Sequence, residues 1–179
     1  MLDFEKLTAL AKEAGFSNAG PLDVATIELK DDVRAMCNAN SCGVYGKNWS
    51  CPPACGELAE LRAKLSQYHE GLLVQTVGEL EDQFDGEGMM ETQEAHMAHF
   101  YALHERLIQD YPNLLALSAG TCTRCRQCTY PDAPCRFPEK RFSSMEAYGM
   151  LVLEVCKANG LEYYYGANAI AYTSCFLLA

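Results

Sequence analysis

The sequence has little positive charge and lacks any long apolar run. Its 14 lysines and arginines stand against 24 aspartates and glutamates, so the formal net charge is −10. This balance argues against a nucleic-acid binder, because contacts with phosphates need a basic surface. No stretch approaches the run of about 18 apolar residues that predicts a transmembrane helix. The N-terminus also lacks the basic and apolar regions of a signal peptide, so we expect no membrane span and no export.

Familiar catalytic motifs are missing too. The chain has no G-x-G-x-x-G, no Walker loop and no Ser/His/Asp arrangement that would name a substrate. Hydrophobic residues nevertheless make up 49% of the 179 residues, which is enough for a proper core. This length predicts a single domain over residues 1–179.

Cysteine is the residue that the chain has in excess. Ten cysteines without a secretion signal point to the reducing cytoplasm, where clustered thiols bind metals more often than they form disulfides. Four of them lie within the stretch 120–141, with the spacing C-x2-C-x2-C-x6-C: Cys122, Cys125, Cys128 and Cys135.

Three thiols spaced three residues apart converge on one small volume. Soft sulfur ligands suit iron–sulfur clusters, zinc or copper(I). A C-x2-C-x2-C run with a distant fourth cysteine is typical of [4Fe–4S] binding, whereas structural zinc usually takes two separated pairs. We therefore predict one [4Fe–4S] cluster on Cys122, Cys125, Cys128 and Cys135, with zinc as the alternative and disulfides or bare thiols as a third possibility.

A second group of cysteines lies in the stretch 37–55, with the spacing C-x4-C-x8-C-x3-C: Cys37, Cys42, Cys51 and Cys55. Glycines and prolines make this stretch a loop. We predict that its four thiols hold a second metal centre. Tyr45 and Trp49 would shield that centre from water, or they are ordinary aromatic packing residues. The alternative is that one or two of them ligate and the others are incidental, because cysteine is often a small buried hydrophobe.

Hydrophobic periodicity predicts an alternation of helices and strands. We expect helices over 4–14, 31–37, 57–69, 91–110 and 143–158, with extended segments over 16–21, 22–29, 72–77, 113–119 and 169–178. Residues 79–90 are predicted to be a surface loop. The alternation in the second half favours an α/β fold with a mixed, largely parallel sheet flanked by helices, from which two cysteine-rich metal-binding loops extend.

Several further residues could ligate a metal but are better explained by packing. His96, His99 and His104 lie on the predicted helix 91–110, where histidines at a core edge are far commoner than a metal site. Cys156 and Cys175 have apolar surroundings, so we expect both to be inert core residues.

Charge is distributed unevenly along the chain. The stretch 122–141 carries +3, while the remainder carries −13. Cations beside a four-thiolate cluster would stabilise its reduced state and raise its potential. The alternatives are a solvated basic loop or an anion-binding patch for a small substrate.

Taken in order, the strings CGVYGKNWSCPP, GTCTRCRQC, PCRFP and SMEAYGMLV resemble an uncharacterised bacterial and archaeal family labelled "predicted metal-binding protein" (domain of unknown function 2284). The resemblance runs from about Cys37 to Gly160. It implies a metal site at Cys122, Cys125, Cys128 and Cys135, and functional importance for Cys37, Cys42 and Cys51. The family label names no reaction.

These features favour an iron–sulfur protein with an electron-transfer or redox role in anaerobic metabolism. An acidic surface suits docking on a basic redox partner protein. Two alternatives stay open: a cluster-dependent reductase acting on a small molecule, and a zinc-stapled interaction module.

Overall fold

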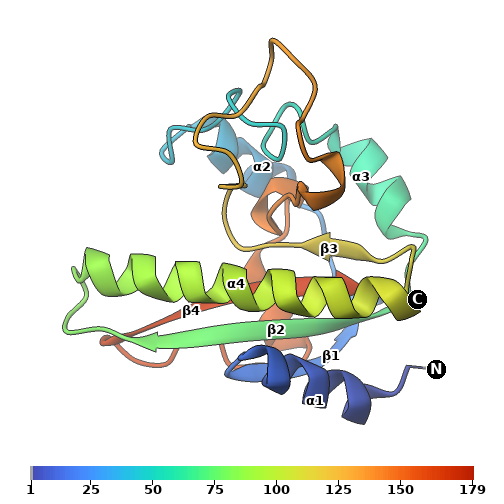
Figure 1. Ribbon diagram of the computed structural model, residues 1–179, viewed down its shortest axis with the longest axis vertical. Coiled ribbons are helices and arrows are strands. Elements are labelled where there is room, and N and C mark those ends of the chain that lie inside the picture. Colours follow the sequence, from blue (N-terminus) through green and yellow to red (C-terminus); the bar gives the residue numbers. More distant parts are fainter. Residues whose placement is uncertain (1) are drawn as a thin grey trace.

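A four-stranded sheet lies between two layers of helices in the computed structural model, which describes residues 2–179 (Figure 1). The strands are β1 (Asn18–Asp23), β2 (Glu70–Glu79), β3 (Leu115–Leu117) and β4 (Ala169–Leu177). The helices are α1 (Phe4–Ala14), α2 (Asp31–Asn38), α3 (Leu58–Leu65), α4 (Gly86–Asp110) and α5 (Val152–Ala158). Short 3-10 turns are η1 (Val24–Thr26), η2 (Pro138–Lys140) and η3 (Glu146–Tyr148).

The prediction of a largely parallel sheet is wrong. The strand order is β1-β2-β4-β3, and every neighbouring pair is antiparallel. The succession β2, α4, β3 does return the chain in the same direction, because β2 and β3 each pair antiparallel with β4. The last strand, however, inserts between them and pairs along its whole length with β2. The alternation of helices and strands therefore predicted that α4 connects two strands of the same direction. It did not predict that β4 lies between these two strands in the sheet.

Alternate residues of the central strands point into two separate cores. On one face, Leu72, Val74 and Phe176 pack beneath α1 and α4. On the other face, Leu73, Cys175 and Leu177 pack against α3, α5 and the residues around η3. Cys156 and Cys175 are both fully buried in this second core, as predicted. Within residues 2–179, no helix combines the length and the apolar character needed to cross a membrane.

The first helix agrees with its prediction in detail. The Asp3 side chain accepts a hydrogen bond from the amide of Lys6 and caps α1, and Gly15 ends it with φ of 109°. Glycine reaches this left-handed conformation without steric cost. The long helix α4 begins at Gly86, inside the predicted loop, because the Asp85 side chain accepts from the amide of Gly88 and caps it.

The predicted helix over 143–158 is broken, which is a second correction. Gly149 adopts φ of 86° between η3 and α5, and a Cβ there would lie 3.0 Å from the carbonyl oxygen of Lys30. The chain therefore turns at Gly149 and packs against the segment around Lys30. The predicted extended segment 22–29 is also wrong over most of its length, because it contains η1 and then a single bridge from Leu29 to Met150.

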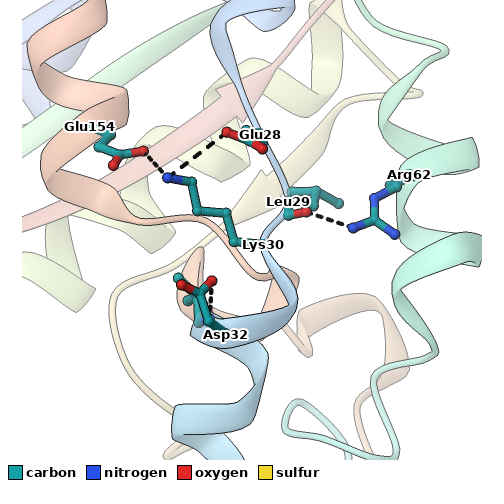
Figure 2. Close-up of polar contacts among 7 residues, drawn as sticks. Glu28, Leu29, Lys30, Asp32, Arg62 and Glu154 are labelled. Atoms are coloured by element: carbon teal, nitrogen blue, oxygen red, sulfur yellow. Dashed lines mark hydrogen bonds and ion pairs between the residues drawn. The ribbon is translucent and has the colours of Figure 1, made fainter.

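Polar contacts fix the segment that leads into α2 (Figure 2). The Lys30 ammonium lies 2.5 Å from the Glu154 carboxylate of α5 and 3.9 Å from Glu28. Arg62 of α3 donates to the carbonyl oxygen of Leu29 at 2.7 Å. Ion pairs at a surface add little stability, so their main effect is positional. They set the start of α2 and hence the place of Cys37 near its end.

Candidate metal centres

The two cysteine regions lie side by side beyond the β3 edge of the sheet (Figure 1). The 120–141 loop follows β3 directly, and the 37–55 loop connects α2 to α3. The Asn48 side chain donates to the carbonyl oxygen of Cys122 at 3.0 Å, and the amide of Cys122 donates to the Ser50 hydroxyl at 3.1 Å. Two stretches far apart in the sequence therefore form one thiol-rich lobe.

All four cysteines of the 120–141 loop line a single small cavity, together with Asn48 and Trp49 from the other loop. The four are Cys122, Cys125, Cys128 and Cys135. The structure thus brings together the set that the spacing predicted. Gly120 makes the turn out of the β3 segment with φ of 78°, a conformation that favours glycine.

The electrostatic surroundings of Cys122 disfavour its ionisation. Burial raises the pKa of the Cys122 thiol, a hydrogen bond with the Arg124 backbone lowers it, and negative charge on Cys135, Cys125 and Cys128 raises it. Like charges close together disfavour ionisation. A bound metal supplies the missing positive charge and holds such cysteines as thiolates. The four sulfur donors therefore suit a thiolate-ligated metal group by their chemistry, while within residues 2–179 no three of these side chains are close enough together to bind one metal ion directly.

Trp49 covers this first cavity instead of the one for which it was predicted. Its backbone amide donates to Cys128 Sγ at 3.5 Å, and its Nε1 donates to the carbonyl oxygen of Ala133 at 3.0 Å. The ring packs edge-on against Tyr130, with centroids 4.9 Å apart. The expectation that Trp49 shields the 37–55 cysteines is wrong, because the loop folds across the neighbouring site.

Three arginines line the same cavity: Arg124, Arg136 and Arg141. Arg136 donates to the carbonyl oxygen of Gln127 at 3.0 Å, which closes the loop on itself. Within residues 2–179, none of the three guanidinium groups has a carboxylate within 4.0 Å. No nearby carboxylate within the described residues therefore offsets the positive charge that these arginines place beside the thiols.

The 37–55 loop makes a larger cavity of about 320 Å³. Cys37, Cys42 and Cys51 line it, with Tyr45 among the other wall residues. Cys51 Sγ lies 3.1 Å from the Thr121 hydroxyl, so this cavity also touches the 120–141 loop. Cys55 is not on its wall; its Sγ lies 3.8 Å from the carbonyl oxygen of Ala147. The structure thus groups three of the four predicted ligands around one space.

Residues that sequence reasoning missed surround this second group. Arg34 of α2 donates to the carbonyl oxygens of Ala147 and Gly56 at 2.7 and 2.5 Å. Burial raises the pKa values of Cys37 and Cys55, while the Arg34 cation acts to lower both. The Glu146 carboxylate lines the cavity, and its negative charge adds to the rise at Cys37. The sequence could have indicated that Arg34 lies near this group, because Arg34 precedes Cys37 by three residues and so shares a face of the predicted helix with it.

Among the histidines of α4, His96 belongs to the core, whereas His99 and His104 are partly exposed. His96 is fully buried, with Nδ1 3.0 Å from the Thr76 hydroxyl and Nε2 2.7 Å from the Ser174 hydroxyl. Burial lowers its pKa to about 3, so the ring is neutral at physiological pH. His99 shares the Thr76 hydroxyl at 3.2 Å. Across the described part of the chain, no three Cys, His, Asp or Glu side chains are close enough together to bind a single metal ion directly.

Comparison with known proteins identifies one family. The family described as "Predicted metal-binding protein (DUF2284)" matches residues 20–178, a stretch that contains all ten cysteines. This confirms the resemblance found in the sequence and extends it toward both ends. No curated protein and no solved structure matches the chain.

Proposed function

We propose that this chain, which belongs to the predicted metal-binding family (DUF2284), holds a [4Fe–4S] cluster on Cys122, Cys125, Cys128 and Cys135. The observation that carries the proposal is the single cavity lined by all four thiols. An all-sulfur donor set favours soft metals. Three of the four donors come from one C-x2-C-x2-C run, which is the ferredoxin-like arrangement for a cluster.

The surroundings of the cavity support a redox centre. The potential of an iron–sulfur cluster depends on hydrogen bonds to its sulfurs, on nearby charge and on exposure to solvent. Here the amide of Trp49 donates to Cys128 Sγ, the indole covers the loop, and three arginines line the wall. The amide hydrogen bond and the three arginines would stabilise the reduced, more negative state of a bound cluster, whereas shielding from water by the indole would act in the opposite direction.

The 37–55 loop would hold a second centre on Cys37, Cys42 and Cys51, with Cys55 as the fourth ligand. The cavity lined by the first three supports this proposal. The Cys55 thiol lies off that wall, but it is close enough that negative charge on Cys51 and Cys37 raises its pKa. A loop rich in glycine and proline gains rigidity from a bound metal, because ligand binding contributes directly to folding.

The function that follows is one-electron transfer in anaerobic metabolism. A bound cluster would supply the electron-accepting group, and the Trp49 amide and the three arginines would tune its potential. The clustering of cysteines favours a reducing compartment such as the cytoplasm. The net charge of −10 suits docking on a basic redox partner protein, with association rates that fall as salt increases.

A cluster-dependent reductase is the second candidate. A separate cavity that shares Arg124 and Arg141 with the thiol cavity favours it, because a small molecule bound there would lie next to the redox centre.

Anaerobic purification followed by optical and paramagnetic resonance spectroscopy tests the proposal. The protein should show broad visible absorption that bleaches on reduction, together with a paramagnetic signal from the reduced cluster. A zinc-stapled interaction module would give neither signal. Colourless protein that contains stoichiometric zinc would contradict the proposal.

A further inference from the structure

A cavity of about 620 Å³ lies between the C-terminal half of α4, strand β3 and the end of the 120–141 loop. Its volume falls within the range of about 300–1,000 Å³ that is usual for small-molecule sites. It contains none of the cysteines described above.

One wall of this cavity is apolar. Tyr101 and Ile108 of α4 face it, with Leu114 before β3 and Phe142 after the loop. Phe142 is anchored from behind by Phe100, whose ring packs edge-on at 5.0 Å between centroids. Such a wall buries the body of an aromatic or other apolar ligand.

Cationic side chains line the same cavity. Arg124, Lys140 and Arg141 line it, whereas the two carboxylates on the cavity are Glu105 and Glu139. The Glu105 carboxylate forms a long ion pair with the Lys140 ammonium, at 3.9 Å. Within residues 2–179, Arg124 and Arg141 have no carboxylate within 4.0 Å. These two cations are therefore available to an anionic ligand.

Aromatic rings hold Arg124 in place. Its guanidinium carbon lies 5.4 Å from the centroid of Tyr101 and 5.8 Å from that of Phe137. These cation–π contacts restrict the guanidinium, and a guanidinium can bind a carboxylate or phosphate through paired N–H donors.

Arg124 and Arg141 also line the thiol cavity, so they form the partition between the two spaces. We propose that the larger cavity binds a small organic anion with an aromatic or other apolar body. Its carboxylate or phosphate pairs with Arg124 and Arg141, and its body lies against Tyr101, Ile108 and Phe142. The ligand then lies one arginine side chain away from the metal centre. This inference goes beyond the proposed electron transfer, and the binding itself does not depend on which metal the thiols hold.

Isothermal titration calorimetry of the anaerobically purified protein tests this site. The probes are benzoate, phenyl phosphate, inorganic phosphate and the neutral benzamide. We expect phenyl phosphate to bind at least about tenfold more tightly than inorganic phosphate, because burial of the ring adds to the charge pairing. Benzamide should not bind measurably. The relative affinities of benzoate and phenyl phosphate distinguish a carboxylate site from a phosphate site.

Matched variants separate this site from general attraction to a basic loop. Arg124→Gln and Arg141→Gln should each weaken binding of the tighter anion by about tenfold, through loss of charge-assisted hydrogen bonds. Arg126→Gln is the control, because Arg126 is exposed in the same loop but lies on neither cavity. It should change the affinity by less than about twofold.

A third variant tests the apolar wall and leaves the charges of the loop unchanged. Ile108→Trp adds bulk on the apolar wall, so it should weaken binding of phenyl phosphate and leave binding of inorganic phosphate unchanged. The proposal is overturned if neither aromatic anion binds, or if Arg124→Gln and Arg126→Gln weaken binding equally. Zinc in place of iron would remove the proposed redox function and leave these binding results intact.

Discussion

The two cysteine regions share one lobe but differ in how their ligands come together. In the 120–141 loop, all four thiols line one cavity, and their convergence follows from local spacing. In the 37–55 loop, three thiols line a cavity whose wall also includes Thr121 from the other loop and Glu146 of η3. The four thiols of the first site therefore come from one short stretch, with Asn48 and Trp49 of the other loop completing its wall, whereas the second cavity is built from several separate segments of the chain.

The charge around the two regions differs as well. Three arginines line the first cavity, whereas the second has the Glu146 carboxylate on its wall and a single arginine, Arg34, close to Cys37 and Cys55. Positive charge favours the reduced form of a cluster, and negative charge disfavours it. If both regions hold clusters, we expect the reduction potential of the 120–141 centre to be higher than that of the 37–55 centre.

Loss of a ligand from the first region should have the largest effect. Cys125→Ser removes a cavity-lining thiol, and about four of about eight iron atoms per chain should be lost if both regions hold [4Fe–4S] clusters. Iron and sulfide analysis measures this directly. Cys156→Ala is the control, because this thiol is buried in the core, where its Sγ lies 3.7 Å from the Gln75 amide. Unchanged iron in Cys125→Ser would show that the ligand assignment is wrong.

A pair of variants sharpens the comparison within the second region. Cys51→Ser should remove the second centre and lower the iron content by about four atoms per chain. Cys55→Ser should cause a smaller loss, because this thiol lies beside Ala147, off the cavity wall. Iron content together with the paramagnetic signal of each variant checks this order. A larger loss in Cys55→Ser than in Cys51→Ser would contradict the placement of the second centre in the cavity.

Charge changes beside the first region should have the smallest effect. Arg124→Gln combined with Arg126→Gln should lower the midpoint potential of the 120–141 centre by roughly tens of millivolts, because two cations that favour the reduced state are lost. Lys64→Gln combined with Lys157→Gln removes the same charge from exposed positions on α3 and α5. This control should change the potential less. A potential that rises in the arginine variant would refute this role for the basic loop.

Local signals predicted the elements whose ends are fixed by nearby residues. The apolar spacing of residues 4–14 predicted α1 correctly, and its end at Gly15 is fixed by the residue next to the helix in the chain. The C-x2-C-x2-C spacing placed three thiols around one cavity for the same reason. Burial of Cys156 and Cys175 followed from their apolar neighbours.

Features set by distant residues could not be predicted in this way. The insertion of β4 between β2 and β3 depends on pairing across the whole sheet, so the predicted parallel arrangement was wrong. Gly149 breaks a strongly periodic helical stretch because the chain there packs against Lys30. Trp49 was assigned to the wrong thiols because nothing in its own loop indicates that it crosses to Cys128 and Ala133.

The central claim is that the thiols of the 120–141 loop hold an iron–sulfur cluster, and metal content tests it most directly. Iron, zinc and acid-labile sulfide should be measured together in protein prepared and kept under anaerobic conditions. The account predicts about four iron and about four sulfide atoms per chain for the first centre, and about eight of each when both regions are filled. About one zinc per chain, with no sulfide, would contradict it.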